Sequence, residues 1–281
     1  MPNDPVKALR RLDLGTLFGL ALSVAGIVGG LVLEGGQIFD IIQPTAALIV
    51  LAGTLGAVLV TNPLKNFCSA VRRLGAVFVR TEEAFEPVAE ALVTFAAKAR
   101  KHGISSLEMD AAAIPDDFFC KALSLAVDGV ESQEIRKTME LDILAREHAI
   151  SADAQVWEAA GGYAPTVGII GAVLGLIQVM KNLENIAAVG HGIAVAFVAT
   201  VYGVALANLF LLPAAGKIKI ESERLAASQE LVLEGVIAIA QGTNPRLIRN
   251  KLDVFGRDPA ARRSRGNLEV MGRSRADAAR G

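Results

Sequence analysis

The sequence predicts an all-α fold: a polytopic membrane protein with four transmembrane helices and a helical cytoplasmic domain. Composition is the first reason, because 52% of the 281 residues are hydrophobic, only 5% are aromatic and the mean hydropathy is positive. An ordinary soluble domain is less apolar than this. The second reason is that four segments of 17 or more residues contain no Asp, Glu, Lys or Arg. A stretch of about 20 apolar residues suffices to cross a bilayer.

The same composition argues against several other classes of protein. The 28 Lys and Arg residues are balanced by 29 Asp and Glu residues, so no strongly basic domain is available to bind a nucleic acid. Cys68 and Cys120 lack the spacing of metal ligands or of a disulfide framework. His102, His148 and His191 have no neighbouring nucleophile or carboxylate set. We therefore expect no enzyme activity, no bound metal and no cofactor.

The first two spans are expected at residues 14–33 and 44–60, after an amino-terminal segment of residues 1–13. The second span should end before Pro63, because proline disfavours helix at the residue that precedes it. The connection between these spans, residues 34–43, carries two acids and no Lys or Arg, whereas the segment after residue 60 is rich in basic residues. Because Lys and Arg hold loops in the cytoplasm, we expect both termini to be cytoplasmic.

The rest of the chain is expected to be helical and to return to the membrane once. Residues 61–158 form the main cytoplasmic region, in which apolar residues recur at helical spacing and no strand is predicted. Within it, Ser105 or Ser106 is expected to cap a short helix. Spans three and four, at residues 159–180 and 192–215, form a hairpin. Cytoplasmic helices at residues 216–255 precede a basic tail at residues 256–281, which we expect to be disordered.

An ion pathway through a bilayer usually needs an ionisable group, and the four spans have none. If the protein conducts ions, a partner chain must supply the acid. Within span four, Thr200 offers a polar side chain; alternatively, its hydroxyl bonds back to the carbonyl of Ala196. Pro165 and Pro213 are expected at one depth in spans three and four, where they either permit hinging or form static kinks.

A known family is recognisable in the hairpin. Residues 161–175, which read GGYAPTVGIIGAVLG, resemble span three of the MotA/PomA subunits of the bacterial flagellar stator. Thr200, thirteen residues before Pro213, is similar to a position in span four of the same family. Residues 242–246 resemble the segment after that span, and the likeness covers roughly residues 13–255.

This resemblance implies a homo-oligomeric ring in the bacterial inner membrane. The ring would surround a MotB/PomB-type partner whose membrane aspartate carries the ion. Pro165 and Pro213 would couple ion passage to movement, and Thr200 would line the ion path. The position of Ala172 is similar to one that threonine occupies in the sodium-type members of the family. Because alanine offers no ligand for Na⁺, we expect the transported ion to be H⁺.

The family's rotor-binding loop is similar to residues 99–108. Arg100, Lys101 and Glu108 would contact the flagellar rotor switch protein (FliG-type); alternatively, Arg100 and Glu108 form a solvated surface pair. Three other functions are alternatives to a flagellar stator subunit. A TolQ/ExbB-type energiser of envelope machinery also relies on a membrane aspartate from a partner chain, but it usually has three spans. A solute transporter would show two similar halves, and a structural scaffold would not need Thr200 or the two prolines.

Overall fold

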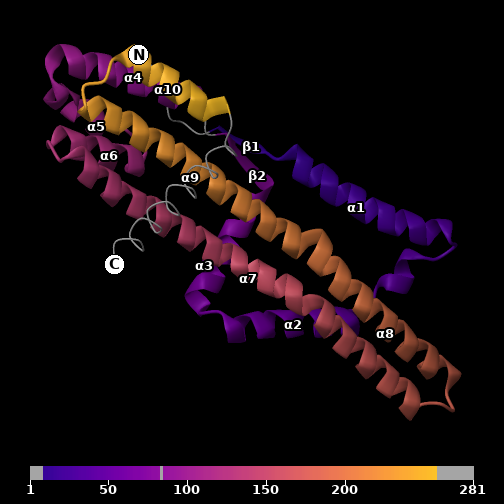
Figure 1. Ribbon diagram of the computed structural model, residues 1–281. Helices are drawn as coiled ribbons and strands as arrows, with labels where there is room; N and C mark the ends of the chain where they lie inside the picture. The colour runs from indigo at the N-terminus through magenta and orange to yellow at the C-terminus, as the bar shows by residue number, and fades with distance from the viewer. Residues whose placement is uncertain (1–8, 83–84, 258–281) are drawn as a thin grey trace, which may run out of the picture. The chain divides into compact units, whose positions relative to one another are not determined.

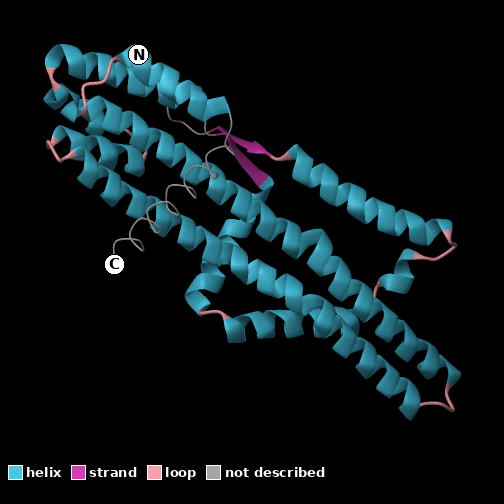
Figure 2. Ribbon diagram, in the orientation of Figure 1, coloured by secondary structure: helices cyan, strands magenta, loops and turns pink. Residues whose placement is uncertain are grey.

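The computed structural model describes residues 9–82 and 85–257, and these residues are helical almost throughout (Figures 1 and 2). The chain forms two compact units. We call residues 10–80 and 148–221 the span unit. The head unit is Leu9 with the described part of residues 81–147 and 222–257. Four of the described helices are long and apolar enough to cross a membrane, which confirms the predicted fold class.

In the span unit, α1 (Leu14–Leu33) and α2 (Pro44–Thr61) are joined through the short helix η1 (Ile38–Ile41). The side chain of Asp13 caps α1 by accepting a hydrogen bond from the amide of Thr16. No residue of α1 is buried, and the helix lies apart from α8 for most of its length (Figure 1). The next helix, α2, instead buries one stripe at four-residue spacing, made of Ala46, Val50, Thr54 and Val58.

The second half of the span unit is a helical hairpin. The 50-residue helix α7 (Ser132–Lys181) begins in the head unit and continues through Pro165 without a break. It is followed by α8 (Ile186–Ala205), which Asn185 caps, so this helix begins six residues before the predicted fourth span. A π-helical segment, η4 (Leu206–Leu211), then leads into α9 (Leu212–Ala240).

The connection after α2 was predicted to contain only helices, and this prediction is wrong in one place. The helix α3 (Leu64–Leu74) and the short helix η2 (Gly75–Phe78) are followed by a strand, β2 (Val79–Glu82). It pairs with β1 (Leu9–Leu12) in a two-stranded sheet (Figure 2). Each strand has only four residues, too few for alternation to show, and the partners are about 70 residues apart in the chain.

The head unit packs helices around one apolar core. Its elements are the start of α7, the end of α9, α4 (Phe85–His102), η3 (Ile104–Leu107), α5 (Glu108–Ala112), α6 (Asp117–Val127) and α10 (Pro245–Arg257). Phe118, Phe119 and Leu92 are among the largest side chains that this core buries completely. Neither Ser105 nor Ser106 caps a helix as expected: η3 begins after Gly103 without a side-chain cap.

The predicted carboxy-terminal boundaries are close to those observed. Gly242, with a φ of 66°, lies in the turn after α9, as expected for a glycine in a left-handed helix terminator. The following helix, α10, ends at Arg257, two residues into the predicted tail. The remainder of that tail, residues 258–281, and residues 1–8 of the amino-terminal segment lie outside the described residues.

Candidate functional site

The two helices of the hairpin approach each other through glycine. A Cβ atom placed on Gly168 would lie 2.8 Å from the carbonyl oxygen of Ala199, and one on Gly175 would lie 2.7 Å from that of Gly192. On the opposite helix, a Cβ on Gly203 would overlap the carbonyl oxygen of Ala164. Small residues allow this kind of close backbone contact between membrane helices, so α7 and α8 form one tightly packed wall.

Thr200 lies in that wall. Its Oγ1 donates a hydrogen bond to the Ala196 carbonyl oxygen at 3.3 Å, so the local bond considered as the alternative reading is present. This bond uses the hydroxyl hydrogen and leaves the lone pairs of Oγ1 able to accept. Gly168 packs against the Cα of Thr200, and Gly171 packs against Ala199. Ala172 is four residues beyond Gly168 on α7, so the two predicted pathway residues lie about one helical turn, or ~6 Å, apart along the wall.

The two predicted coupling prolines do not lie at the same level, which corrects the expectation from the sequence. Gly161 packs directly against Leu212, the neighbour of Pro213. Gly203 packs against Ala164, the residue before Pro165, and Pro213 is ten residues beyond Gly203. Pro213 therefore lies at least one helical turn, or ~5.4 Å, from the level of Pro165. The expectation took the depth of each proline from the predicted ends of the spans, whereas the contacts between the helices determine it. A π-helical segment, η4, precedes Pro213. Such segments often occur at functional sites.

Three ion pairs lie in the span unit just beyond the prolines. Lys217 Nζ lies 2.5 Å from Asp13, joining α9 to the start of α1. Lys219 Nζ lies 2.6 Å from Glu158, joining α9 to α7. The hydrogen bond from Lys217, with a second from the Thr16 amide, lowers the pKa of Asp13 to about 2, so this carboxyl stays ionised at neutral pH.

In the third ion pair the acid is buried and the arginine is partly exposed. Arg73 Nε lies 2.8 Å from Asp153 Oδ2, joining α3 to α7, and the hydroxyl of Ser69 donates to the same oxygen. Only 5% of the Asp153 side chain is exposed. One turn along α7, the indole of Trp157 donates to the carbonyl oxygen of Ala70. These contacts fix α3 on α7, and none of them was predicted, because each joins residues about 80 or more positions apart.

Tyr202 supplies a further link that the sequence did not reveal. Its hydroxyl donates to the carbonyl oxygen of Ile41 and accepts from the amide of Gln43 at 3.4 Å. The connection that leads into α2 is thereby bonded to α8. The only signal in the sequence was a polar aromatic residue close to Thr200.

The predicted rotor-binding residues lie at one end of the head unit. Arg100 and Lys101 are in the last turn of α4 and Glu108 begins α5, and all three side chains are exposed. Among the described residues, Arg100 and Glu108 form no ion pair with each other or with any other side chain. The two helices are instead joined by Lys98 and Asp110, whose charged atoms lie 2.5 Å apart. The alternative reading of a surface pair is therefore not observed.

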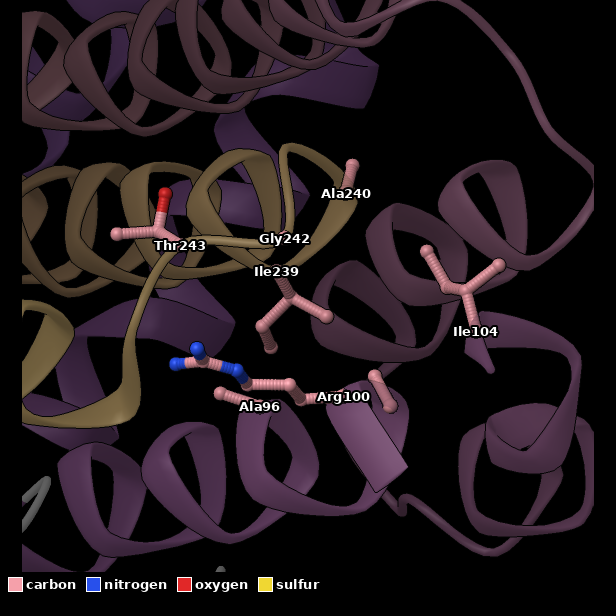
Figure 3. A pocket seen from close by; sticks show the side chains of 8 residues that line it. Ala96, Arg100, Ile104, Ile239, Ala240, Gly242 and Thr243 are labelled. Carbon is pink, nitrogen blue, oxygen red and sulfur yellow. The ribbon is translucent and has the colours of Figure 1, made fainter. Parts of the chain in front are cut away.

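Arg100 also borders a cavity of about 210 Å³ (Figure 3). Its guanidinium group reaches toward the segment that carries Gly242 and Thr243 (Figure 3). Lys101 and Glu108 do not line this cavity. In the described ranges, no cluster of three or more His, Cys, Asp or Glu side chains could hold a metal ion.

Comparison with known families matches most of the chain. Residues 110–231 match the MotA/TolQ/ExbB proton channel family, and residues 17–103 match the family described as Motility protein A N-terminal. The chain is 35% identical to Motility protein A of Helicobacter pylori, over 86% of this chain and 94% of that protein. It is 32% identical to Chemotaxis protein PomA of Vibrio alginolyticus, over 86% and 94%.

Solved structures with the same arrangement of helices are known. The structure of C. jejuni MotAB contains a chain with a TM-score of 0.83 and 33% identity, covering 87% of this chain and 96% of that chain. The flagellar MotAB stator complex from Bacillus subtilis gives a TM-score of 0.78 at 34% identity, with coverages of 84% and 93%. The similarity therefore extends over both the span unit and the head unit.

Proposed function

The chain belongs to the MotA/TolQ/ExbB proton channel family and to its motility protein A branch, and on this basis we propose its function. It is a flagellar motor stator subunit that, with a MotB-type partner, converts ion flow across the membrane into torque on the rotor. The likeness of nearly the whole chain to MotAB stator structures carries this conclusion. A TolQ/ExbB-type energiser is less favoured, because the match to the motility protein A amino-terminal region spans most of α1 and all of α2 and α4.

The partner would contribute the charge that the spans lack. No Asp, Glu, Lys or Arg occurs in any of the four predicted spans, so an ion-binding carboxylate must come from a second chain. The wall of α7 and α8 would surround that carboxylate in a homo-oligomeric ring. Thr200, whose hydroxyl lone pairs remain able to accept, would line the ion path about one helical turn from Ala172.

Movement would be generated where the helices are least regular. Pro213 follows the π-helical segment η4, and its missing amide hydrogen removes a backbone bond from this turn. Protonation of the partner's carboxylate would change the charge beside α7 and α8 and shift the balance between two packings of these helices. The helices α7 and α9 run unbroken into the head unit, so both can transmit a rotation.

The transported ion is proposed to be H⁺. Alanine at position 172 provides no oxygen ligand, whereas a desolvated Na⁺ needs several. A proton requires only an acceptor such as the partner's carboxylate. Sodium coupling is the alternative, and rotation that persists on a sodium gradient without a proton gradient would distinguish it.

The head unit is proposed to contact the rotor. Arg100, Lys101 and Glu108 present exposed charges of both signs at one end, and the described residues provide no ion-pair partner for Arg100 or Glu108. Charges of this kind set the rate and register of docking. A FliG-type rotor switch protein is the proposed partner. The distribution of Lys and Arg supports an inner-membrane location with both termini in the cytoplasm.

Complementation tests the proposed function. The chain, together with its candidate partner, is expressed either in a strain that lacks its flagellar stator or in one that lacks its TolQ/ExbB-type energiser. We expect swimming to return in the first strain and no rescue of the envelope defect in the second. Rescue of the second strain alone would favour the energiser.

A further inference from the structure

The cavity beside Arg100 is a hollow in the end of the head unit whose surface is more apolar than polar. It is formed where the last turns of α4 and α9 meet η3, and its lining is almost entirely small or aliphatic (Figure 3). The residues that line it are Ala96, Ala99, Arg100, Ile104, Ile239, Ala240, Gly242 and Thr243.

The hollow exists because small residues converge where two helices end. Ala96 and Ile239 are buried in the core and form its floor. Gly242, in its left-handed conformation, turns the chain away at the end of α9 and adds no side chain to fill the space. Ala99 and Ala240 contribute only methyl groups to the lining. Larger side chains at these positions would fill the hollow.

One basic residue, Arg100, lines the hollow. Arg100, Lys101 and His102 are consecutive exposed residues at the end of α4. Within the described residues, Arg100 has no carboxylate partner, and the nearby Asp110 is bonded to Lys98. An occupant that complements this site must combine an apolar side chain with an adjacent negative charge.

We propose that this hollow is a socket for the rotor: it receives one aliphatic or aromatic side chain from an acidic segment of the rotor switch protein, while a neighbouring carboxylate of that segment pairs with Arg100. This inference rests on the proposed function. An apolar anchor in a desolvated pocket beside an arginine is the usual source of affinity at protein interfaces. The socket would provide binding affinity, whereas the surrounding charges would set the rate and orientation of association.

The first test fills the socket without changing any charge. Ala99→Leu and Thr243→Leu are compared with Ala145→Leu, which adds the same bulk at an exposed position of α7 outside the socket. We expect each socket variant to lower torque at high load several-fold at normal membrane levels, and Ala145→Leu to rotate like the wild type. Arg100→Glu is measured alongside. If it abolishes rotation while both socket variants keep full torque, the proposed function stands and the socket is ruled out.

The second test does not depend on how well these variants fold. Thr243→Cys and, as a control on an exposed part of α10, Asn250→Cys are made in a chain whose Cys68 and Cys120 are replaced by alanine. Each is labelled with a maleimide in membranes, with and without the purified rotor switch protein. We expect that protein to slow labelling at position 243 and not at position 250. Equal rates at position 243 would overturn the socket.

Discussion

Lys219 Nζ lies 2.6 Å from Glu158 Oε1, and this ion pair links α9 to α7 on the head-unit side of Pro213 and Pro165. Glu158 is seven residues before Pro165 on α7, and Lys219 is six residues after Pro213 on α9. The pair lies on the same side of both prolines. The two helices are therefore tied together at the point from which they continue toward the head unit.

Reversing either charge of this pair should weaken the coupling of ion flow to rotation. Both side chains are about 40% exposed, so the pair stabilises the fold by at most ~1 kcal/mol. We expect Glu158→Lys and Lys219→Glu each to reduce motor torque at unchanged membrane levels. The double variant, which restores opposite charges, should recover most of the torque. A double variant no better than either single one would contradict a role for the pair.

The pair of Arg73 with the buried acid Asp153 should matter for stability instead. Arg73→Leu leaves the Asp153 carboxylate buried with only the Ser69 hydroxyl. We expect a loss of about 2–3 kcal/mol in the free energy of unfolding, below the value for a fully buried pair because Arg73 is partly exposed. The measurement is denaturant unfolding of the purified protein in detergent. Arg72→Leu, which changes an exposed neighbour of the same charge, is the control and should unfold like the wild type.

Gly203 tests the close packing of α7 and α8. A methyl group there would overlap the carbonyl oxygen of Ala164, and the backbone cannot yield without separating the helices. We expect Gly203→Ala to lower the free energy of unfolding by about 1–3 kcal/mol and to abolish rotation. Gly162→Ala places the same methyl group in open space on the same helix pair. If both variants behave alike, the contact between Gly203 and Ala164 does not determine how closely α7 and α8 pack.

The pair of Asp13 and Lys217 should not respond to physiological changes in pH. Because the pKa of Asp13 in the folded protein is about 2, below the ordinary value of about 3.9, the stabilisation is fully present above about pH 4. It is lost as the pH falls through about 2. We expect the difference in melting temperature between wild type and Asp13→Asn to be constant from about pH 8 to about pH 5 and to shrink below about pH 4.

A lysine variant provides the control for this pH dependence. In a Lys217→Met background the largest cause of the lowered Asp13 pKa is gone, so Asp13→Asn should change the melting temperature much less. A difference between wild type and Asp13→Asn that already shrinks between about pH 7 and about pH 5 would contradict the assignment of this ion pair.

The features predicted from the sequence are those that depend on local composition. The helix α1 spans the predicted residues 14–33, and α2 ends one residue after the predicted second span, at Thr61. A span is defined by its own apolar length and by a nearby stop such as Pro63, so no distant contact is needed to find it. The family resemblance likewise rested on contiguous residues around Pro165.

The features that were missed depend on contacts between distant parts of the chain. The sheet of β1 and β2, the bond from Tyr202 to Ile41 and the pair of Arg73 and Asp153 each join residues more than 65 positions apart. Periodicity reports only which face of a helix is buried, not what covers it. The relative levels of Pro165 and Pro213 were wrong for a related reason, since they depend on which residues of the two helices are in contact.

The most direct test of the account is the rotation of motors driven by this chain and its partner in a strain that lacks its own stator. An ionophore collapses the proton gradient while a sodium gradient is maintained. A proton-driven stator, with alanine at position 172, is expected to stop and to restart when the ionophore is washed out. Rotation that persists on the sodium gradient would contradict proton coupling, and motors that never turn before the ionophore is added would contradict the stator function itself.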